Sequence, residues 1–140
     1  MMRPPIVVSA LLLCATATAA PGFAQTSAQF QACDKTAKTQ FALGVCASNE
    51  LAVRNRQMQS VYSAILSHLA GQPATLAKIK AMQQAWRAYV AAYLVALYPA
   101  ADKQFEYGTI YPMEVDLNQA ALVQAHTKDL QGILLSLTRH

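Results

Sequence analysis

A helical spacing of apolar residues, repeated through most of the chain, restricts the fold more than any other feature of the sequence. In three stretches, apolar side chains recur at intervals of three, four and seven residues, which places them on one face of a helix. The first stretch contains Leu51, Met58, Val61, Tyr62, Ile65, Leu66 and Leu69; the second contains Leu76, Ile79, Met82, Trp86, Tyr89, Val90, Tyr93 and Leu97; the third contains Val115, Leu122, Leu130, Ile133 and Leu137, with His126 on the same face. The alternating pattern of a strand is almost absent, so the sequence predicts an all-α protein.

Residues that stop and start helices separate these stretches. A Gly-Gln-Pro triplet at 71–73 ends the first stretch and opens the second, which stops before Pro99. Pro112 suits the first turn of the third helix. A shorter helix is expected around 30–38, and Thr39 is a suitable N-cap for the long helix that follows. We therefore predict a small antiparallel bundle of three long helices plus a short N-terminal helix, with a loop between the two prolines.

The first 24 residues have the features of a secretory signal peptide. One positive charge, Arg3, precedes an apolar run of about ten residues, which is too short for a membrane span of about 20 residues. Small residues at Gly22 and Ala24 favour cleavage before Gln25, and an Ala-Thr-Ala triplet at 17–19 offers a second site. We therefore expect residues 1–24 to be a signal peptide and residues 25–140 to form one helical domain. The product would be periplasmic or secreted, with no membrane span.

Cysteine usage agrees with export. Cys14 lies in the predicted signal peptide. A cysteine that carries a lipid usually follows a small residue, whereas Leu13 precedes Cys14, so we expect Cys14 to be removed with the signal peptide. In an exported chain the remaining pair, Cys33 and Cys46, favours a disulfide over a metal half-site or two separate thiols. Thirteen positions along one straight helix span roughly 20 Å, whereas bonded cysteines have Cα atoms within about 7 Å. The bond therefore requires a turn between the cysteines, which a new helix at Thr39 would supply.

The charge balance argues against one class of partner. The chain has a formal net charge of +4, and loss of Arg3 with the signal leaves ten basic residues against seven acidic ones, or +3. These basic residues are spread thinly, whereas nucleic-acid-binding proteins usually concentrate them on one face. We therefore expect no nucleic-acid partner.

Several short motifs follow one another in an order that resembles a known family. The motifs are Cys33-Asp34, Thr39-Gln40, Cys46-Ala47, Met58-Gln59-x-x-Tyr62 and Gln83-x-x-Trp86-x-x-Tyr89. In this order and spacing they resemble the lysozyme inhibitor LprI-like domain of bacterial envelope proteins, over about residues 33–130. The resemblance implies an exported binding protein that inhibits lysozyme by steric occlusion of its glycan cleft, with no chemistry of its own.

The chain also departs from the family pattern. Val90-Ala91 stands where the family has an Arg-Asp pair, and Gln59 stands where it has an asparagine. The family's third and fourth cysteines would fall at Leu94 and near Asn118, and both are missing, as expected if those two pair with each other in relatives. The resemblance therefore also leaves the first two cysteines to pair with each other.

No polar side chains form a pattern typical of an active site. His126 lies on an apolar helical face with Asp129 nearby, and a metal site would need a third ligand that nothing in the sequence recommends. No serine has the glycine-elbow context of a hydrolase nucleophile. The aromatic residues of the second stretch have the spacing of core residues, the alternative being an aromatic ligand platform. We therefore expect no enzyme activity, no metal and no cofactor, and a structural core that includes Met58, Tyr62, Trp86 and Tyr89.

The segment DKQFEYGTIY, from Asp102 to Tyr111, is the best candidate for a contact surface with a partner. Aromatic and acidic residues beside a glycine, on a rigid helical scaffold, suit partner binding. The candidate residues are Asp102, Phe105, Glu106, Tyr107 and Tyr111. The alternative is that Phe105 and Tyr111 only cover the helix ends and close the core.

The net charge of the domain bears on whether its partner is a lysozyme. Common c-type lysozymes are strongly basic, so an inhibitor gains from an acidic surface, yet the domain as a whole is about +3. A local acidic patch would still suit a lysozyme, and its residues would be Asp102, Glu106, Glu114 and Asp116.

Two other functions remain open at this point. The chain could be an accessory or structural envelope protein that binds another envelope protein or an anionic cell-wall polymer. An exposed apolar stripe on the first or last helix would support that function, and a fully closed bundle would count against it. A small-ligand carrier would instead need a cavity beneath Trp86.

Overall fold

The computed structural model describes residues 26–139, and these residues form helices joined by short connections. The helices are α1 (Ala28–Thr36), α2 (Gln40–His68), α3 (Pro73–Leu97), α4 (Lys103–Tyr107), the 3-10 turn η1 (Gly108–Ile110) and α5 (Tyr111–Thr138). No strand occurs among them. The predicted bundle of three long helices plus a short N-terminal helix is confirmed. The predicted signal peptide and Cys14 lie outside the described residues.

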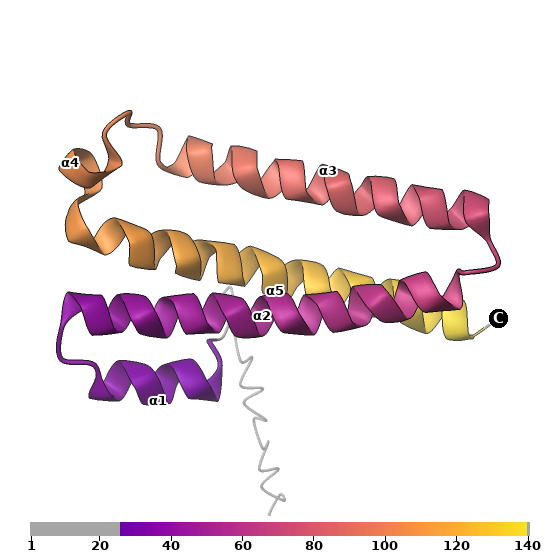
Figure 1. Cartoon of the computed structure of the whole chain (residues 1–140), viewed down its shortest axis with the longest axis horizontal. Coiled ribbons are helices and arrows are strands. Elements are labelled where there is room, and N and C mark those ends of the chain that lie inside the picture. The colour runs from indigo at the N-terminus through magenta and orange to yellow at the C-terminus, as the bar shows by residue number, and fades with distance from the viewer. Residues whose placement is uncertain (1–25, 140) are drawn as a thin grey trace, which may run out of the picture.

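In Figure 1 the long helix α2 runs from left to right, α3 returns from right to left, and α5 runs from left to right again. Successive long helices are antiparallel, so α2 and α5 run in the same direction, and these two lie side by side along most of their length. α3 runs the other way and makes far less backbone contact with either of them. α1 folds back beside the first turns of α2. The looser attachment of α3 leaves room for grooves along its sides.

The helix boundaries follow the capping residues in the sequence. The Thr39 hydroxyl accepts a hydrogen bond from the amide of Ala42 at 3.1 Å and so caps α2, as predicted. Pro73 and Pro112 lie in the first turns of α3 and α5, where the missing N–H has no helical partner to lose. The short helix begins at Ala28, two residues before the predicted start, because Ser27 caps it by accepting from the amide of Phe30.

The core lies between the C-terminal halves of α2 and α5, and the first half of α3 packs against it. Its buried members are Met58, Tyr62, Ile65, Leu69, Val123 and Leu130. Met58 and Tyr62 therefore lie where the sequence analysis placed them, and the half-buried Trp86 packs against the cluster.

Tyr89 does not belong to the core, and that part of the prediction is wrong. Its side chain is 53% exposed, whereas Val90 beside it is buried. With about 3.6 residues per turn, Val90 returns to within about 40° of Trp86, but Tyr89 lies about 60° to the other side. Because α3 contacts the bundle through a narrow face, that rotation turns Tyr89 outward, where its ring lies 6.0 Å from the ring of Tyr93.

A disulfide joins Cys33 of α1 to Cys46 of α2, as predicted. The two Cα atoms are 5.7 Å apart, because the chain turns between Thr36 and Gln40. Cys46 is fully buried, while α1 contains no fully buried residue. The disulfide therefore attaches an otherwise weakly packed helix to the bundle.

None of the helices in residues 26–139 is both long enough and apolar enough to cross a membrane.

Candidate functional site

The predicted contact segment is not a loop. Residues 103–107 form α4, and residues 108–110 form η1. Asp102 caps α4 by accepting a hydrogen bond from the amide of Phe105 at 2.9 Å. Gly108 follows with a φ of +66°, a conformation that suits glycine and turns the chain toward α5. A five-residue helix is too short to produce a helical spacing in the sequence, so the sequence pattern predicts a loop here.

Three tyrosines hold this end of the bundle together. The ring of Tyr98 lies edge-on to the rings of Tyr107 and Tyr111, with centroids 5.2 and 5.1 Å away. The rings of Tyr107 and Tyr111 stack on each other at 5.7 Å. The Tyr107 hydroxyl also accepts a hydrogen bond from the amide of Ala100 at 3.1 Å. Tyr107 and Tyr111, two of the predicted partner-binding residues, are half-buried and pack within this cluster.

Lys103 fixes the turn between α3 and α4. Its ammonium group donates to the carbonyl of Tyr98 at 2.6 Å and to the carbonyl of Ala100. Both acceptors lie just after the end of α3, where carbonyl groups lack helical partners. The turn is thus held by a cation on one side and by the tyrosine rings on the other.

The outer surface of α4 presents an aromatic ring between two carboxylates. Phe105 is 86% exposed, the most exposed large apolar side chain in the described part of the chain, and Asp102 and Glu106 beside it are also exposed. The suggestion that Phe105 closes the core is therefore wrong. We call these three residues the α4 tip.

The predicted acidic patch is smaller than four residues. Glu114 is half-buried and lies 3.4 Å from the hydroxyl of Tyr98. Asp116 is also half-buried, and burial raises the pKa of its carboxyl. The exposed carboxylates of the patch are thus those of the α4 tip.

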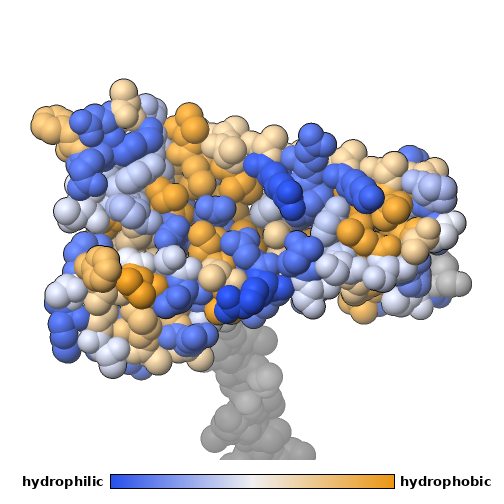
Figure 2. Space-filling view, viewed as in Figure 1, coloured by the Kyte–Doolittle hydropathy of each residue, from blue (hydrophilic) through white to orange (hydrophobic). Residues whose placement is uncertain are grey.

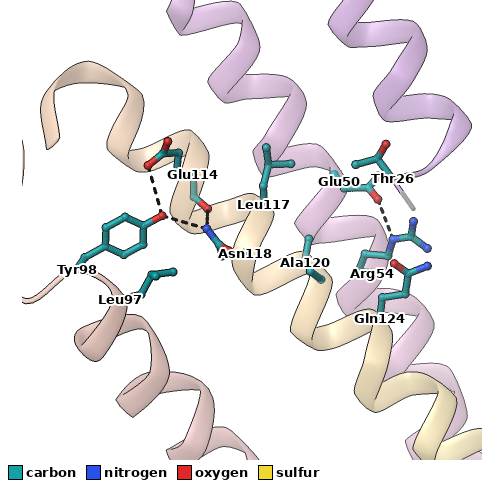
Figure 3. Close-up of a pocket in the computed structure, with 11 residues that line it drawn as sticks. Thr26, Glu50, Arg54, Leu97, Tyr98, Glu114, Leu117, Asn118, Ala120 and Gln124 are labelled. Atoms are coloured by element: carbon teal, nitrogen blue, oxygen red, sulfur yellow. Dashed lines mark hydrogen bonds and ion pairs between the residues drawn. The ribbon is translucent and has the colours of Figure 1, made fainter. Parts of the chain in front are cut away.

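A groove of about 490 Å³ runs from Tyr98 toward α2, along α5 (Figure 3). At one end, the Tyr98 hydroxyl accepts a hydrogen bond from the Asn118 amide at 3.0 Å and faces the carboxylate of Glu114. Burial, and after it the Glu114 charge, raises the pKa of Tyr98. The Asn118–Tyr98 hydrogen bond connects the end of α3 to α5.

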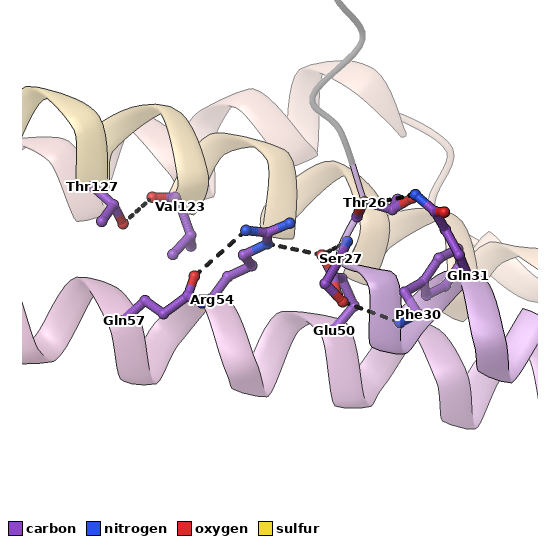
Figure 4. Close-up of polar contacts among 9 residues, drawn as sticks. All are labelled: Thr26, Ser27, Phe30, Gln31, Glu50, Arg54, Gln57, Val123 and Thr127. Carbon is purple, nitrogen blue, oxygen red and sulfur yellow. Dashed lines mark hydrogen bonds and ion pairs between the residues drawn. The ribbon is translucent and has the colours of Figure 1, made fainter.

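Glu50 lies at the other end of the groove and anchors the start of the described chain (Figure 4). Its carboxylate accepts hydrogen bonds from the amide of Ser27 at 3.0 Å and from the hydroxyl of the same residue. It also forms an ion pair with Arg54 at 2.8 Å. Burial by itself raises the pKa of Glu50, but the Ser27 hydrogen bonds and the Arg54 charge together hold that pKa below its ordinary value.

Replacing Glu50 with glutamine is expected to lower the free energy of unfolding at neutral pH by about 1.5–3 kcal/mol, the range for hydrogen bonds to charged groups. Because the folded pKa lies below the unfolded one, the carboxylate stabilises the protein above the unfolded pKa. This stabilisation is lost as pH falls through the folded pKa. The variant should therefore lose less stability in acid than the parent does, measured by urea denaturation over a pH series.

Glu106→Gln is the matched control, because that carboxylate is exposed. Its stability is expected to stay within about 0.5 kcal/mol of the parent. A Glu50→Gln variant with the parent's stability and acid response would contradict this account of the anchor.

His126 is a structural residue of the core. Its Nε2 lies 2.8 Å from Oε1 of Gln83, and its ring stacks on Trp86 with centroids 4.1 Å apart. Burial lowers the pKa of His126, while the charge of Asp129 opposes that shift. No group of three or more metal-ligating side chains is assembled anywhere in residues 26–139.

Sequence reasoning missed the two ends of the groove. Glu50 is the only acidic residue of α2, and it stands four positions before Arg54, a spacing that favours an ion pair. That signal was present in the sequence, but it does not reveal the contact with Ser27, which depends on how α1 folds back. The tyrosine cluster gave no local signal, because Tyr98 lies nine and 13 positions from its two partners.

Comparison with known proteins adds one finding. A family model described as "Lysozyme inhibitor LprI" matches residues 33–130, which is more than half of the chain. No curated protein and no solved structure matches the chain.

Proposed function

The chain belongs to the lysozyme inhibitor LprI family, and from this membership we propose that it is an exported binding protein that inhibits lysozyme. In this proposal the α4 tip contacts the enzyme, and the bundle behind it occludes the glycan cleft. The protein contributes no chemistry of its own. Residues 1–24 would direct export and be removed, leaving a periplasmic or secreted protein with the Cys33–Cys46 disulfide.

The observation that carries the proposal is the exposure of Phe105. A phenylalanine that is 86% exposed leaves a large apolar surface in contact with water, which is unfavourable unless a partner covers it. Aromatic residues are frequent among the few side chains that supply most of the energy of an interface. Asp102 and Glu106 on either side would attract a basic enzyme and orient its approach.

The scaffold behind the tip supports the same proposal. The Asp102 cap, the Lys103 hydrogen bonds and the tyrosine rings hold α4 in one position before any partner arrives. A surface that is already ordered loses less conformational entropy on binding, so more of its contact energy contributes to affinity.

Replacing Phe105 with alanine is expected to raise the concentration needed to inhibit a sensitive lysozyme by about 30-fold, which corresponds to about 2 kcal/mol. The measurement is residual muramidase activity on cell walls over a concentration series of parent and variant. Leu135→Ala is the matched control, because Leu135 is another exposed apolar residue but lies near the opposite end of α5. Equal inhibition by the parent and Phe105→Ala proteins would contradict a role for the α4 tip.

An accessory envelope role is the second candidate, and a different apolar surface favours it. Phe41 is 82% exposed and Val45 is 44% exposed in the first turns of α2. They border an apolar groove of about 500 Å³ that Pro112 and Met113 of α5 also line. An exposed apolar stripe at the start of α2 supports such a role. A partner bound there would be lost on Phe41→Ala and retained on Phe105→Ala, the reverse of the result expected for lysozyme.

A further inference from the structure

A second groove lies between α2 and α3, away from the α4 tip. Its volume is about 630 Å³, within the roughly 300–1,000 Å³ of ligand sites. We call it the arginine groove, and its principal lining residues are Arg56, Met58, Trp86, Arg87, Val90 and Leu94. It exists because α3 makes so little backbone contact with the α2–α5 pair.

Apart from its two arginines, the arginine groove is lined mostly by apolar side chains, with Asn55, Gln59 and Gln119 as its neutral polar members. Met58 and Val90 form part of its floor and are themselves buried, while Leu94 is half-buried. Figure 2 shows apolar side chains in the hollow between α3 and α2, with strongly hydrophilic side chains at its edges. Trp86 is held in place by its stack on His126, so this wall of the groove is rigid.

The rim of the groove carries two exposed arginines. Arg56 projects from α2 and Arg87 from α3, both are exposed, and neither forms an ion pair within the described part of the chain. No carboxylate lines the groove. The sequence contains no acidic residue between Glu50 and Asp102, which covers nearly all of the two helices that form the rim.

We propose that the arginine groove binds an anionic amphiphile, a molecule with a phosphate or carboxylate head and a single apolar chain. The two guanidinium groups bind the head, since each can donate two parallel hydrogen bonds to a phosphate or carboxylate. The chain lies over Met58, Val90 and Leu94, where its burial from water supplies the rest of the affinity. A purely apolar ligand would leave the arginines unused, and a simple anion would leave the floor exposed.

This site is independent of the proposed lysozyme contact. None of the groove residues belongs to α4 or η1, so either site can fail without affecting the other. The groove also contains the only tryptophan of the chain, and its fluorescence therefore reports occupancy directly.

The test uses dodecyl phosphate below its micelle concentration as the probe, titrated into the oxidised protein. Tryptophan fluorescence and calorimetry are expected to show one saturable site per chain. Dodecanoate should bind to the same site. Dodecyl maltoside, which has the same chain but no charge, and inorganic phosphate, which has no chain, are each expected to bind at least about tenfold more weakly.

Paired substitutions locate the site. The double variant Arg56→Gln/Arg87→Gln is expected to weaken binding of dodecyl phosphate by about tenfold or more. The control Lys78→Gln/Lys80→Gln removes the same charge from exposed positions of α3 outside the groove and should leave binding unchanged. Circular dichroism of all variants confirms that the bundle is intact.

Three results would overturn the proposal. Equal binding of the charged and uncharged dodecyl compounds would show that the arginines play no part, and equal binding of inorganic phosphate would show that the floor plays none. A concentration-dependent dimer that the arginine substitutions abolish would show that a second copy of the chain occupies the groove.

Discussion

Replacing Trp86 with alanine is expected to lower the free energy of unfolding by about 3 kcal/mol, the low end of the range for a core tryptophan because the side chain is half-buried. The loss has two sources. The indole packs against the core of α2 and α5, and its removal leaves a cavity there. It also covers one face of the His126 ring, with centroids 4.1 Å apart and planes within 8° of parallel. Urea denaturation followed by circular dichroism measures the change.

A second readout separates this packing account from a general loss of structure. Burial lowers the pKa of His126, so uncovering its ring should return that pKa toward its ordinary value in the Trp86→Ala protein. A titration of the His126 ring by NMR follows this shift. Tyr89→Ala is the control, because Tyr89 lies on the same helix but faces outward, and its removal should cost well under 1 kcal/mol. If Trp86→Ala and Tyr89→Ala lowered the free energy of unfolding equally, the position assigned to the core would be contradicted.

Replacing both Cys33 and Cys46 with alanine is expected to cost about 3 kcal/mol, the chain-entropy value for a loop of this length. The effect should be concentrated in α1. That helix has nine residues and no fully buried side chain, and isolated helices shorter than about 12 residues are marginal in water. Without the disulfide, α1 keeps only its contacts with α2 and the Ser27–Glu50 hydrogen bonds.

Hydrogen exchange tests this prediction by region. The amides of α1 should lose protection in the double variant, while those of Ile65 and Leu130 in the core keep most of theirs. Intact mass provides the check on the parent, which should be lighter by two hydrogen atoms before reduction than after it. An unchanged mass on reduction would remove the disulfide from the account.

The long helices and their ends were predictable from the sequence because the signals are local and repeated. Apolar spacing identifies α2, α3 and α5, and Thr39, Pro73 and Pro112 mark where helices begin. The disulfide was predictable because the turn between the cysteines follows from the same reasoning. The helix ends depend on residues within one or two helical turns of each other, and the disulfide depends on the turn that those ends place between Cys33 and Cys46.

The features that could not be predicted from the sequence depend on how the helices face one another. Tyr89 and Trp86 belong to one apolar stripe in the sequence, but the face of α3 that contacts the bundle is narrow and includes Trp86 but not Tyr89. Phe105 could either cover the core or point outward, and the decision rests on the tyrosine cluster beneath α4. The grooves arise from the loose attachment of α3, which no local pattern specifies.

The central claim is that this protein binds lysozyme and blocks its activity. The direct test is calorimetric titration of the oxidised protein against c-type and g-type lysozymes at moderate salt, with muramidase activity measured on the same mixtures. We expect sub-micromolar binding to at least one class with matching loss of activity, and an affinity that falls as added salt screens Asp102 and Glu106. No binding and full activity with every lysozyme tested would contradict the claim and move the search to an envelope partner at Phe41.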